Sequence, residues 1–241
     1  MNCAVLPKKR MEFFCAAAAL GERLSPVRFC VIIGSRENRP RGRTKRRNGN
    51  MLKGKHVVLA VTGGIAAYKM ATMASLLVKQ HADVQVLMTQ NATNFINPIT
   101  FETLTGHKCL VDTFDRNFEF NVEHVSVAKQ ADIALVAPAT ANVIGKLANG
   151  LADDMLTTTL LACKCKKLVA PAMNTQMYEN PIVQDNMKKL EHYGMELIQP
   201  VSGHLACGDS GMGKMVEPEV VLQYILRDLA LEKDMKGLRV L

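Results

Sequence analysis

The sequence lacks the features that would place it outside ordinary globular proteins. Its 241 residues include 16 glycines and 9 prolines, too few for a fibrous or low-complexity chain. No apolar run approaches the roughly 18 residues that a membrane-spanning helix needs. Its seven cysteines are an odd number, in a chain long enough to build a core without disulfides. We therefore expect a soluble cytoplasmic protein with reduced cysteines and no membrane partner.

Most of the chain also lacks an excess of basic charge. The formal net charge is +8, but residues 1–50 carry 12 Lys and Arg against 3 Asp and Glu, which leaves 18 against 19 for residues 51–241. A surface that binds nucleic acid would need basic side chains on the folded part of the protein. The charge distribution therefore argues against nucleic acid as a partner.

Residues 1–50 are predicted to lie outside the folded domain. Their Arg-rich, acid-poor composition is compatible with an organelle transit peptide. A secretory signal is disfavoured because charges interrupt its apolar part and no small-residue cleavage site follows. An extension translated from a misplaced start explains the same composition, and we favour it. The folded protein is then expected to begin at Met51.

From residue 51 onward, short apolar runs alternate with helical patterns. The expected strands are residues 56–62, 84–88, 133–137, 167–170 and 195–198. The expected helices are residues 65–80, 143–148, 156–162, 182–192 and 218–232, the last preceded by a glycine-rich loop at 203–213. Such alternation predicts a parallel sheet covered by helices on both faces. We therefore expect an α/β protein, a Rossmann- or flavodoxin-like three-layer sandwich with a mainly parallel sheet.

The loop after the first predicted strand has the character of a phosphate-binding turn. Gly63 and Gly64 would let the backbone approach an anion at a helix N-terminus. The turn does not match the GxGxxG dinucleotide pattern, and the polar residues Thr89 to Asn91 stand where that pattern requires an acid. A mononucleotide is therefore favoured over NAD. Glycines in such a turn can also serve a purely steric purpose.

Further polar groups follow the third and fourth predicted strands. Thr140 to Asn142 have side chains suited to capping the next helix, which alone would explain them. Asn174, Met177 and Tyr178 offer an amide, a thioether and an aromatic ring in one loop, which suits a site for a carboxylate beside a flat apolar ring. His124 stands just before a short helical stretch, where an isolated histidine is commonly only a surface or capping residue.

Three strings of residues give the chain a resemblance to a known family. They are "APATANVIGKLANGLADDML" at 137–156, "PAMNTQMY" at 171–178 and "ACGDSGMGKM" at 206–215. With them, residues 51–233 resemble the homo-oligomeric flavin-containing cysteine decarboxylases. The resemblance implies FMN-dependent decarboxylation of N-(4′-phosphopantothenoyl)cysteine to 4′-phosphopantetheine in coenzyme A biosynthesis.

The end of the chain suggests a second domain. The string "DMKGLRVL" at 234–241 echoes "MLKGKHVVL" at 51–59. Bacterial bifunctional members of the family carry a phosphopantothenate–cysteine ligase domain after the decarboxylase. We expect residues 234–241 to be the truncated start of such a domain, with a chance match between two short strings as the alternative.

The resemblance also implies catalytic roles. Simple loss of CO₂ from an acylated cysteine would leave an unstabilised carbanion. Family enzymes avoid this by transient oxidation of the thiol to a thioaldehyde, after which the reduced flavin returns hydride to the decarboxylated product. His124 would be the base in thiol oxidation, Asn174 would bind the substrate carboxylate, and Cys207 would protonate the ene-thiolate. Gly208, Gly211 and Gly213 suggest that Cys207 lies on a mobile flap.

Binding residues and assembly follow from the same resemblance. The expected FMN contacts are Gly63, Gly64, Ile65, Thr89, Asn91, Thr140, Ala141, Asn142 and Ala172. The expected substrate contacts are Asn174, Met177 and Lys69, the last a candidate for the substrate phosphate. No metal is expected, because His204 and Cys207 do not complete a four-ligand set. Family members form trimers or dodecamers with FMN between subunits, which would join His124 and Asn174 from neighbouring chains.

Other interpretations remain open. A peptidyl-cysteine decarboxylase or a flavin prenyltransferase would keep the fold and the cofactor. The flap with Cys207 and the ligase-like tail argue against the first, and the pairing of Asn174 with His124 argues against the second. A phosphatase-inhibitor subunit is the non-enzymatic alternative, although it would tolerate loss of the three catalytic residues that are present here. A plain NAD-binding module is disfavoured by the missing third glycine and acidic residue.

Overall fold

The structure, a computed structural model, describes residues 51–113, 123–204, 208 and 210–230. The predictions for the leader at 1–50, for Cys207 and for the ligase-like tail at 234–241 lie outside the described residues. None of the described helices is long and apolar enough to cross a membrane.

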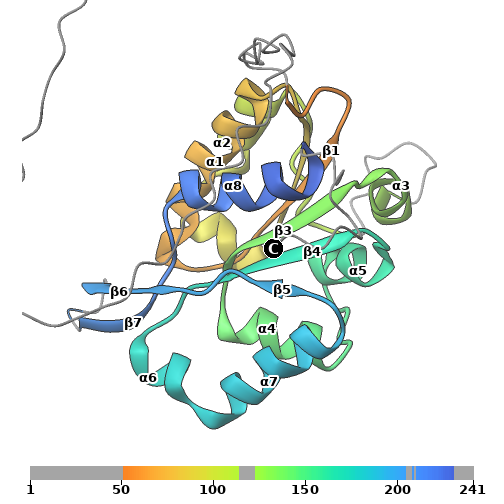
Figure 1. Cartoon of the computed structure of the whole chain (residues 1–241). Helices are drawn as coiled ribbons and strands as arrows, with labels where there is room; N and C mark the ends of the chain where they lie inside the picture. The colour runs from red at the N-terminus through yellow and green to blue at the C-terminus, as the bar shows by residue number, and fades with distance from the viewer. Residues whose placement is uncertain (1–50, 114–122, 205–207, 209, 231–241) are drawn as a thin grey trace, which may run out of the picture. The chain divides into compact units, whose positions relative to one another are not determined.

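The core of the protein is a five-stranded parallel sheet (Figure 1). Its strands, in the order β2-β1-β3-β4-β5, are β1 His56–Val61, β2 Asp83–Met88, β3 Ile133–Ala139, β4 Lys166–Pro171 and β5 Glu196–Leu197. Almost every residue of β1 and β3 is buried, as expected for parallel strands that are covered on both faces. The strand order is that of flavodoxin-like folds, with the chain reversing direction across the sheet between β1 and β3. The predicted fold class is confirmed.

Two layers of helices bury the two faces of the sheet (Figure 1). Val57, Leu59 and Val61 of β1 contribute to one core cluster, and Val58 and Ala60 contribute to the other, because successive strand residues point to opposite faces. The first face is covered by α1 Lys69–Lys79, α2 Pro98–Thr105 and α8 Pro218–Leu229. The second face is covered by α3 Glu123–Gln130, α4 Ala141–Ala148, α5 Met155–Ala162 and α7 Pro181–His192.

Side-chain caps define where several of these helices begin. Thr140 caps α4, and Asp154 forms a capping box with Thr157 at the start of α5. Asn97 and Asn180 cap α2 and α7, each followed by a proline in the first turn. Thr140 directly follows β3, so this cap also lies at the carboxyl end of a strand.

Several local predictions were wrong. The glycine-rich segment expected as a loop forms an antiparallel hairpin of β6 Val201–His204 and β7 Ser210–Lys214. The loop after β4 contains the short helix α6 Thr175–Glu179, and His124 lies within α3 instead of before it. The helix expected from residue 65 begins as the 3-10 helix η1 Ile65–Tyr68. Short polar turns and a glycine-rich strand carry no apolar period, so periodicity does not reveal them.

Candidate functional site

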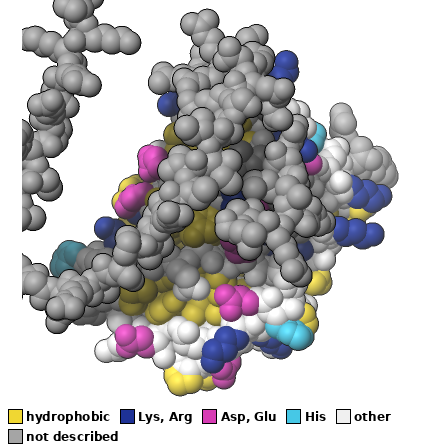
Figure 2. Space-filling view, in the orientation of Figure 1, with side chains coloured by type: hydrophobic (Ala, Val, Ile, Leu, Met, Phe, Trp, Pro, Cys, Tyr) yellow, Lys and Arg dark blue, Asp and Glu magenta, His cyan; other side chains and the backbone are white. Residues whose placement is uncertain are grey.

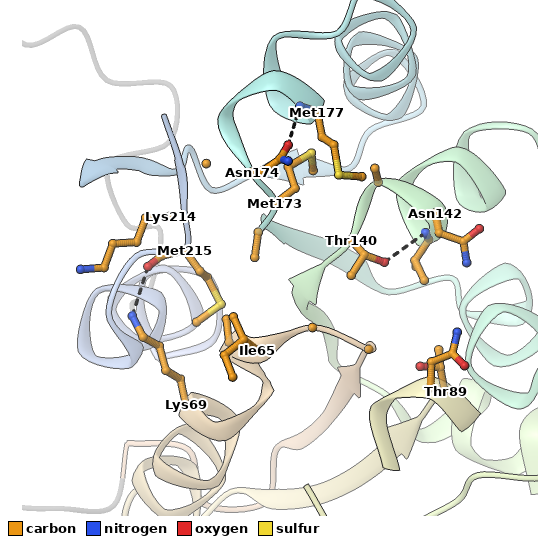
Figure 3. Close-up of a pocket in the computed structure, with 18 of the residues that line it drawn as sticks. Ile65, Lys69, Thr89, Thr140, Asn142, Met173, Asn174, Met177, Lys214 and Met215 are labelled. Carbon is orange, nitrogen blue, oxygen red and sulfur yellow. Dashed lines mark hydrogen bonds between the residues drawn. The ribbon is translucent and has the colours of Figure 1, made fainter. Parts of the chain in front are cut away.

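A cavity of about 740 Å³ opens at the carboxyl ends of β1, β3 and β4 (Figure 3). This volume lies in the range of sites for cofactors and small substrates, and the location is the one at which open α/β sheets bind ligands. All the predicted cofactor contacts line it: Gly63, Gly64, Ile65, Thr89, Asn91, Thr140, Ala141, Asn142 and Ala172. The three predicted substrate contacts, Lys69, Asn174 and Met177, line it as well. The structure therefore brings together residues that lie far apart in the sequence.

The two glycines after β1 have different reasons to be glycine. A Cβ on Gly63 would stand 2.7 Å from the Cβ of Asn91, so the close passage of the segment after β2 excludes any side chain there. A Cβ on Gly64 would meet only the Cγ2 of Thr140, at 3.6 Å. Gly64 begins η1 without a side-chain cap. The first N–H groups of this helix therefore have no capping side chain, which favours an anionic group at this wall.

The hydroxyls of the threonines in the cavity are engaged within the chain. Thr89 begins the 3-10 helix η2 Gln90–Asn94 and accepts a hydrogen bond from the N–H of Ala92 at 3.3 Å. Thr140 accepts from the N–H of Val143 at 3.5 Å, as the capping explanation requires. The carboxamides of Asn91 and Asn142 have no hydrogen-bond partner among the described residues and line the same cavity. The two amides therefore offer both a donor and an acceptor to a ligand, whereas the hydroxyls, which accept within the chain, keep their O–H groups as donors.

Asn174 presents an uncharged hydrogen-bond donor to the cavity. Its Oδ1 accepts from the N–H of Met177 at 2.8 Å and thereby caps α6 (Figure 3). This bond orients the carboxamide and leaves its NH₂ group, the donor end, without a partner in the described part of the chain. Met173 and Met177 line the cavity beside it. The wall thus combines one amide donor with polarizable apolar surface, which suits a carboxylate next to a flat ring.

Two of the lysines that line the cavity are already paired with acids. The Nζ of Lys69 lies 2.8 Å from the Oε1 of Glu217 and 3.3 Å from the carbonyl oxygen of Met215. The hydrogen bond from Lys69 lowers the pKa of the Glu217 carboxyl. Lys146 contacts Asp153 at 2.7 Å and Asp154 at 3.2 Å. The hydrogen bond to Asp153 raises the pKa of Lys146, although burial opposes this rise.

The hairpin packs directly on the loop that carries Asn174. The N–H of Met173 donates to the carbonyl of Gly213 at 3.1 Å. A Cβ on Gly213 would collide with the carbonyl oxygen of Met173, and a Cβ on Gly211 would collide with the Oγ1 of Thr175. Gly213 also has a φ of +130°, which disfavours other residues. The glycines of β7 therefore allow a close approach between two segments of the chain.

His124, the predicted base, is not brought into this cavity by the described part of one chain. His124 is half-buried on α3, which packs against α5, and it is not among the residues that line the cavity. Cys207 lies outside the described residues. Among the described residues, no group of three or more His, Cys, Asp or Glu side chains is placed to hold a metal ion.

Sequence reasoning also missed several residues of the cavity wall. They are Met173, His204, Lys214 and Met215 on the hairpin side, and Lys146 and Asp154 near α4. All except His204 belong to the three strings that carried the family resemblance. The signal was therefore present, but no spacing rule shows that these positions face one space.

The chain matches known proteins over most of its length. Residues 45–230 match the family model described as "Flavoprotein". The chain is 47% identical over 182 residues to the "Coenzyme A biosynthesis bifunctional protein CoaBC" of Bacillus subtilis (strain 168), which covers 76% of this chain and 45% of that protein. It therefore spans less than half the length of this relative.

A shorter relative is matched over nearly its whole length. The "Probable phosphopantothenoylcysteine decarboxylase" of Streptococcus mutans is 42% identical over 177 residues, which cover 73% of this chain and 99% of that protein. Among solved structures, the chain is similar to a PPC decarboxylase mutant complexed with pantothenoylaminoethenethiol. That match has a TM-score of 0.63 and 29% identity, and it covers 71% of this chain and 96% of the other.

Proposed function

The chain belongs to the Flavoprotein family, and on this premise we propose that it is an FMN-dependent decarboxylase. Its substrate would be N-(4′-phosphopantothenoyl)cysteine and its product 4′-phosphopantetheine, in coenzyme A biosynthesis. The identity to a probable phosphopantothenoylcysteine decarboxylase over 99% of that protein supports the proposal. The observation that carries it is the single cavity that unites the Gly63–Gly64 turn, the start of α4 and Asn174.

The wall of the cavity fits the cofactor. The uncapped start of η1 at Gly64 and the start of α4 would hold the FMN phosphate, because both offer helix N-termini to an anion. Asn91 and Asn142 would bind the polar chain of the cofactor, and Ala172 would contact its ring. When bound, FMN supplies a reversible two-electron oxidation, which the side chains of the protein cannot supply.

The residues of this chain would position the substrate and exclude water. The NH₂ group of Asn174 would donate to the substrate carboxylate without holding it as firmly as a cation would, so that CO₂ can still leave. Met177 would cover the reacting carbon. Lys69 is our candidate for the substrate phosphate, with its ammonium held at the cavity wall by Glu217 and the carbonyl of Met215.

The remaining two groups would come from outside the described wall of one chain. We assign the role of base to His124 and the role of acid to Cys207. Because His124 lies away from the cavity of its own chain, it would serve the cavity of a neighbouring copy in a homotrimer or a dodecamer.

Free cysteines, three of them among the described residues, support a cytoplasmic location.

The test of this proposal is cofactor uptake followed by a decarboxylation assay. The purified chain is expected to show the visible absorption bands of FMN and to release CO₂ from N-(4′-phosphopantothenoyl)cysteine. The product should be the saturated thiol. A stable ene-thiol product, or turnover of a C-terminal peptidyl cysteine alone, would favour the peptidyl-cysteine decarboxylases instead. A colourless protein that takes up no FMN would refute the proposal.

A mixing experiment tests the shared site. His124→Asn should be inactive and Asn174→Ala should keep only a small residual activity, whereas co-expression of both should restore activity. Random association would place an intact His124 and an intact Asn174 at roughly a quarter of the interfaces. Recovery of about that fraction of wild-type activity per site is expected. No recovery in mixed oligomers would show that both residues act within one chain.

A further inference from the structure

The wall of the cavity contains a lysine that makes no ion pair within the described part of the chain. Three lysines line the cavity, Lys69, Lys146 and Lys214. Lys69 pairs with Glu217 at 2.8 Å, and Lys146 contacts two aspartates. Lys214, the last residue of β7, has neither a hydrogen bond nor an ion pair from its side chain to any described residue. Its ammonium group can therefore bind an anion in the cavity without giving up a partner.

The hairpin holds Lys214 close to the loop that carries Asn174. Lys214 follows Gly213, whose carbonyl oxygen accepts from the N–H of Met173 at 3.1 Å. Its side chain lies over Gly203 of β6, because a Cβ on Gly203 would stand 3.1 Å from the Cδ of Lys214 and 3.8 Å from its Nζ. The missing side chain at position 203 therefore leaves room for this lysine at the cavity wall.

The hairpin side of the cavity carries an excess of positive charge. Figure 3 shows Lys69 and Lys214 together on this side, across the cavity from Thr140 and Asn142. The hydrogen bond from Lys69, with the charges of Lys69 and Lys214, lowers the pKa of the Glu217 carboxyl, although burial opposes this. Two ammonium groups thus share one carboxylate. One positive charge is left over for a ligand on this side.

We propose that Lys214 binds the phosphate of the substrate together with Lys69, and that it thereby sets a preference for the phosphorylated substrate. This inference rests on the decarboxylase function proposed above. The starts of η1 and α4 are assigned to the phosphate of FMN, so the substrate phosphate needs another wall, and the hairpin side supplies the cation. An ammonium group binds a phosphate through charge-assisted hydrogen bonds. Because the phosphate lies far along the substrate from the reacting carbon, this contact contributes to binding and not to the chemical step.

Steady-state kinetics with two substrates test this role. The first is N-(4′-phosphopantothenoyl)cysteine, and the second is pantothenoylcysteine, which lacks the phosphate. Lys214→Met should raise KM for the first by about tenfold and for the second by less than about twofold, with the loss in KM and not in kcat. Lys214→Arg keeps the charge and should bring KM back to within about threefold of the wild type. An equal loss with both substrates would overturn the proposal, because it would reveal a purely structural effect.

Glu217 provides a variant whose effect should have the opposite sign. Its side chain is 57% exposed and does not line the cavity. Glu217→Gln removes the carboxylate beside the two ammonium groups but keeps an oxygen that can accept from Lys69. It should lower KM for the phosphorylated substrate by about twofold and leave KM for pantothenoylcysteine unchanged. A rise in KM like that of Lys214→Met would contradict a role of charge in this preference.

The matched control is Lys79→Met. Lys79 is an exposed lysine in the last turn of α1 and does not line the cavity. The variant loses the same charge as Lys214→Met and should change neither KM. A tenfold rise in KM for the phosphorylated substrate in this variant as well would show that overall charge, and not Lys214, sets the preference.

Ligand binding separates this inference from the proposed function. Titration calorimetry of the whole chain with 4′-phosphopantetheine and with pantetheine measures the contribution of the phosphate without turnover. The wild type should bind the phosphorylated compound more tightly, and Lys214→Met should reduce that preference by about tenfold, with a smaller effect at high salt. Equal binding of both compounds, or a full preference in Lys214→Met, would overturn this inference even if the chain decarboxylates its substrate. A wild-type chain without decarboxylase activity would refute the proposed function, whereas a phosphate preference that depends on Lys214 would still stand.

Discussion

The two ends of the parallel sheet differ in whether their polar side chains are paired with one another. At the amino end, polar and charged side chains at or next to the starts of the strands pair with one another. The carboxylate oxygens of Asp83 lie 2.9 Å from Nδ1 of His56 and 2.7 Å from Nε2 of His107. The Nζ of Lys55 lies 3.3 Å from Oδ1 of Asp132. At the carboxyl end, the amides of Asn91, Asn142 and Asn174 line a cavity.

A network of four charges continues the pairing along the amino end. Lys166 lies 2.6 Å from Glu196 and 2.8 Å from Asp228. Arg227 reaches the same two carboxylates at 2.7 and 3.0 Å. These charged groups obtain their partners within the chain, whereas the NH₂ groups of Asn91, Asn142 and Asn174 have none among the described residues. The difference indicates that the amino end contributes to stability and that the carboxyl end is open to a ligand.

Figure 2 shows hydrophobic side chains gathered between the hairpin and the helices α6 and α7, on the cavity side of the molecule.

The largest effect should come from Asn174. Asn174→Ala removes a neutral donor to the substrate carboxylate, and a hydrogen bond to a charged group contributes roughly 1.5–3 kcal/mol. We expect kcat/KM for decarboxylation to fall by about 100-fold. Steady-state CO₂ release measures this fall, and FMN binding should change little.

Asn180 provides the matched control for this variant. Its Oδ1 caps α7 by accepting from the N–H of Ile182 at 2.9 Å, as Asn174 caps α6, but it does not line the cavity. Asn180→Ala should lose about 1 kcal/mol of stability and retain normal kcat/KM. If the two variants lose the same activity, capping and not contact with substrate explains the role of Asn174.

The second prediction concerns the hairpin that closes the cavity. Gly213→Ala would force a Cβ against the carbonyl of Met173 at a φ of +130°. We expect the free energy of unfolding to fall by roughly 2 kcal/mol, measured by urea denaturation. Gly208→Ala is the control, because Gly208 also has a positive φ of +90° but no described atom within 4 Å of the added Cβ, and it should cost about 1 kcal/mol. An equal loss in both would mean that backbone strain alone matters.

The smallest effect is expected at the amino end. Hydrogen bonds from Arg227 lower the pKa of Glu196. Burial alone would raise the pKa of Asp228, but hydrogen bonds from Arg227 and Lys166 outweigh burial and lower it. Because both folded pKa values lie below the unfolded ones, this contribution is present above about pH 4 and is lost as the pH falls through the folded values. Since the Arg227 side chain is 45% exposed, solvent screening reduces the contribution of these ion pairs to the free energy of unfolding to about 0.5–1 kcal/mol.

Arg227→Met tests this contribution. The variant should lose stability at pH 7, differ less from the wild type below pH 4, and keep its decarboxylase activity. Lys188→Met is the control, because Lys188 pairs only at 3.5 Å with Asp185 and both side chains are more than 70% exposed. Its stability should not change. A fall in activity for Arg227→Met would contradict the separation of roles between the two ends.

The sequence predicted the sheet well because buried parallel strands are continuous apolar runs. All five predicted strands are present, and no strand end differs from its predicted position by more than two residues. The residues predicted to contact the cofactor and the substrate line one cavity, since the loops after parallel strands meet at one edge. The hairpin and α6 were missed because glycines, amides and caps give no periodic signal, and their structure depends on the segments against which they pack.

Other features depend on contacts between distant residues. The glycine at 63 is required by Asn91, and the glycine at 213 is required by Met173. No pattern near these glycines reveals either collision. The pairing of Lys69 with Glu217 likewise joins residues 148 positions apart. Such contacts bring the hairpin and α8 to the wall of the cavity.

Local order along the chain was enough to establish the layers of this protein, the edge of the sheet at which its cavity opens, and its family. Hydrophobic periodicity and short motifs encode these properties within a few residues of each other. Which donors stay unpaired and which cations are paired with acids was decided only by tertiary packing. These properties depend on distances between groups that the sequence separates, and a small change in such a distance can make or break the interaction.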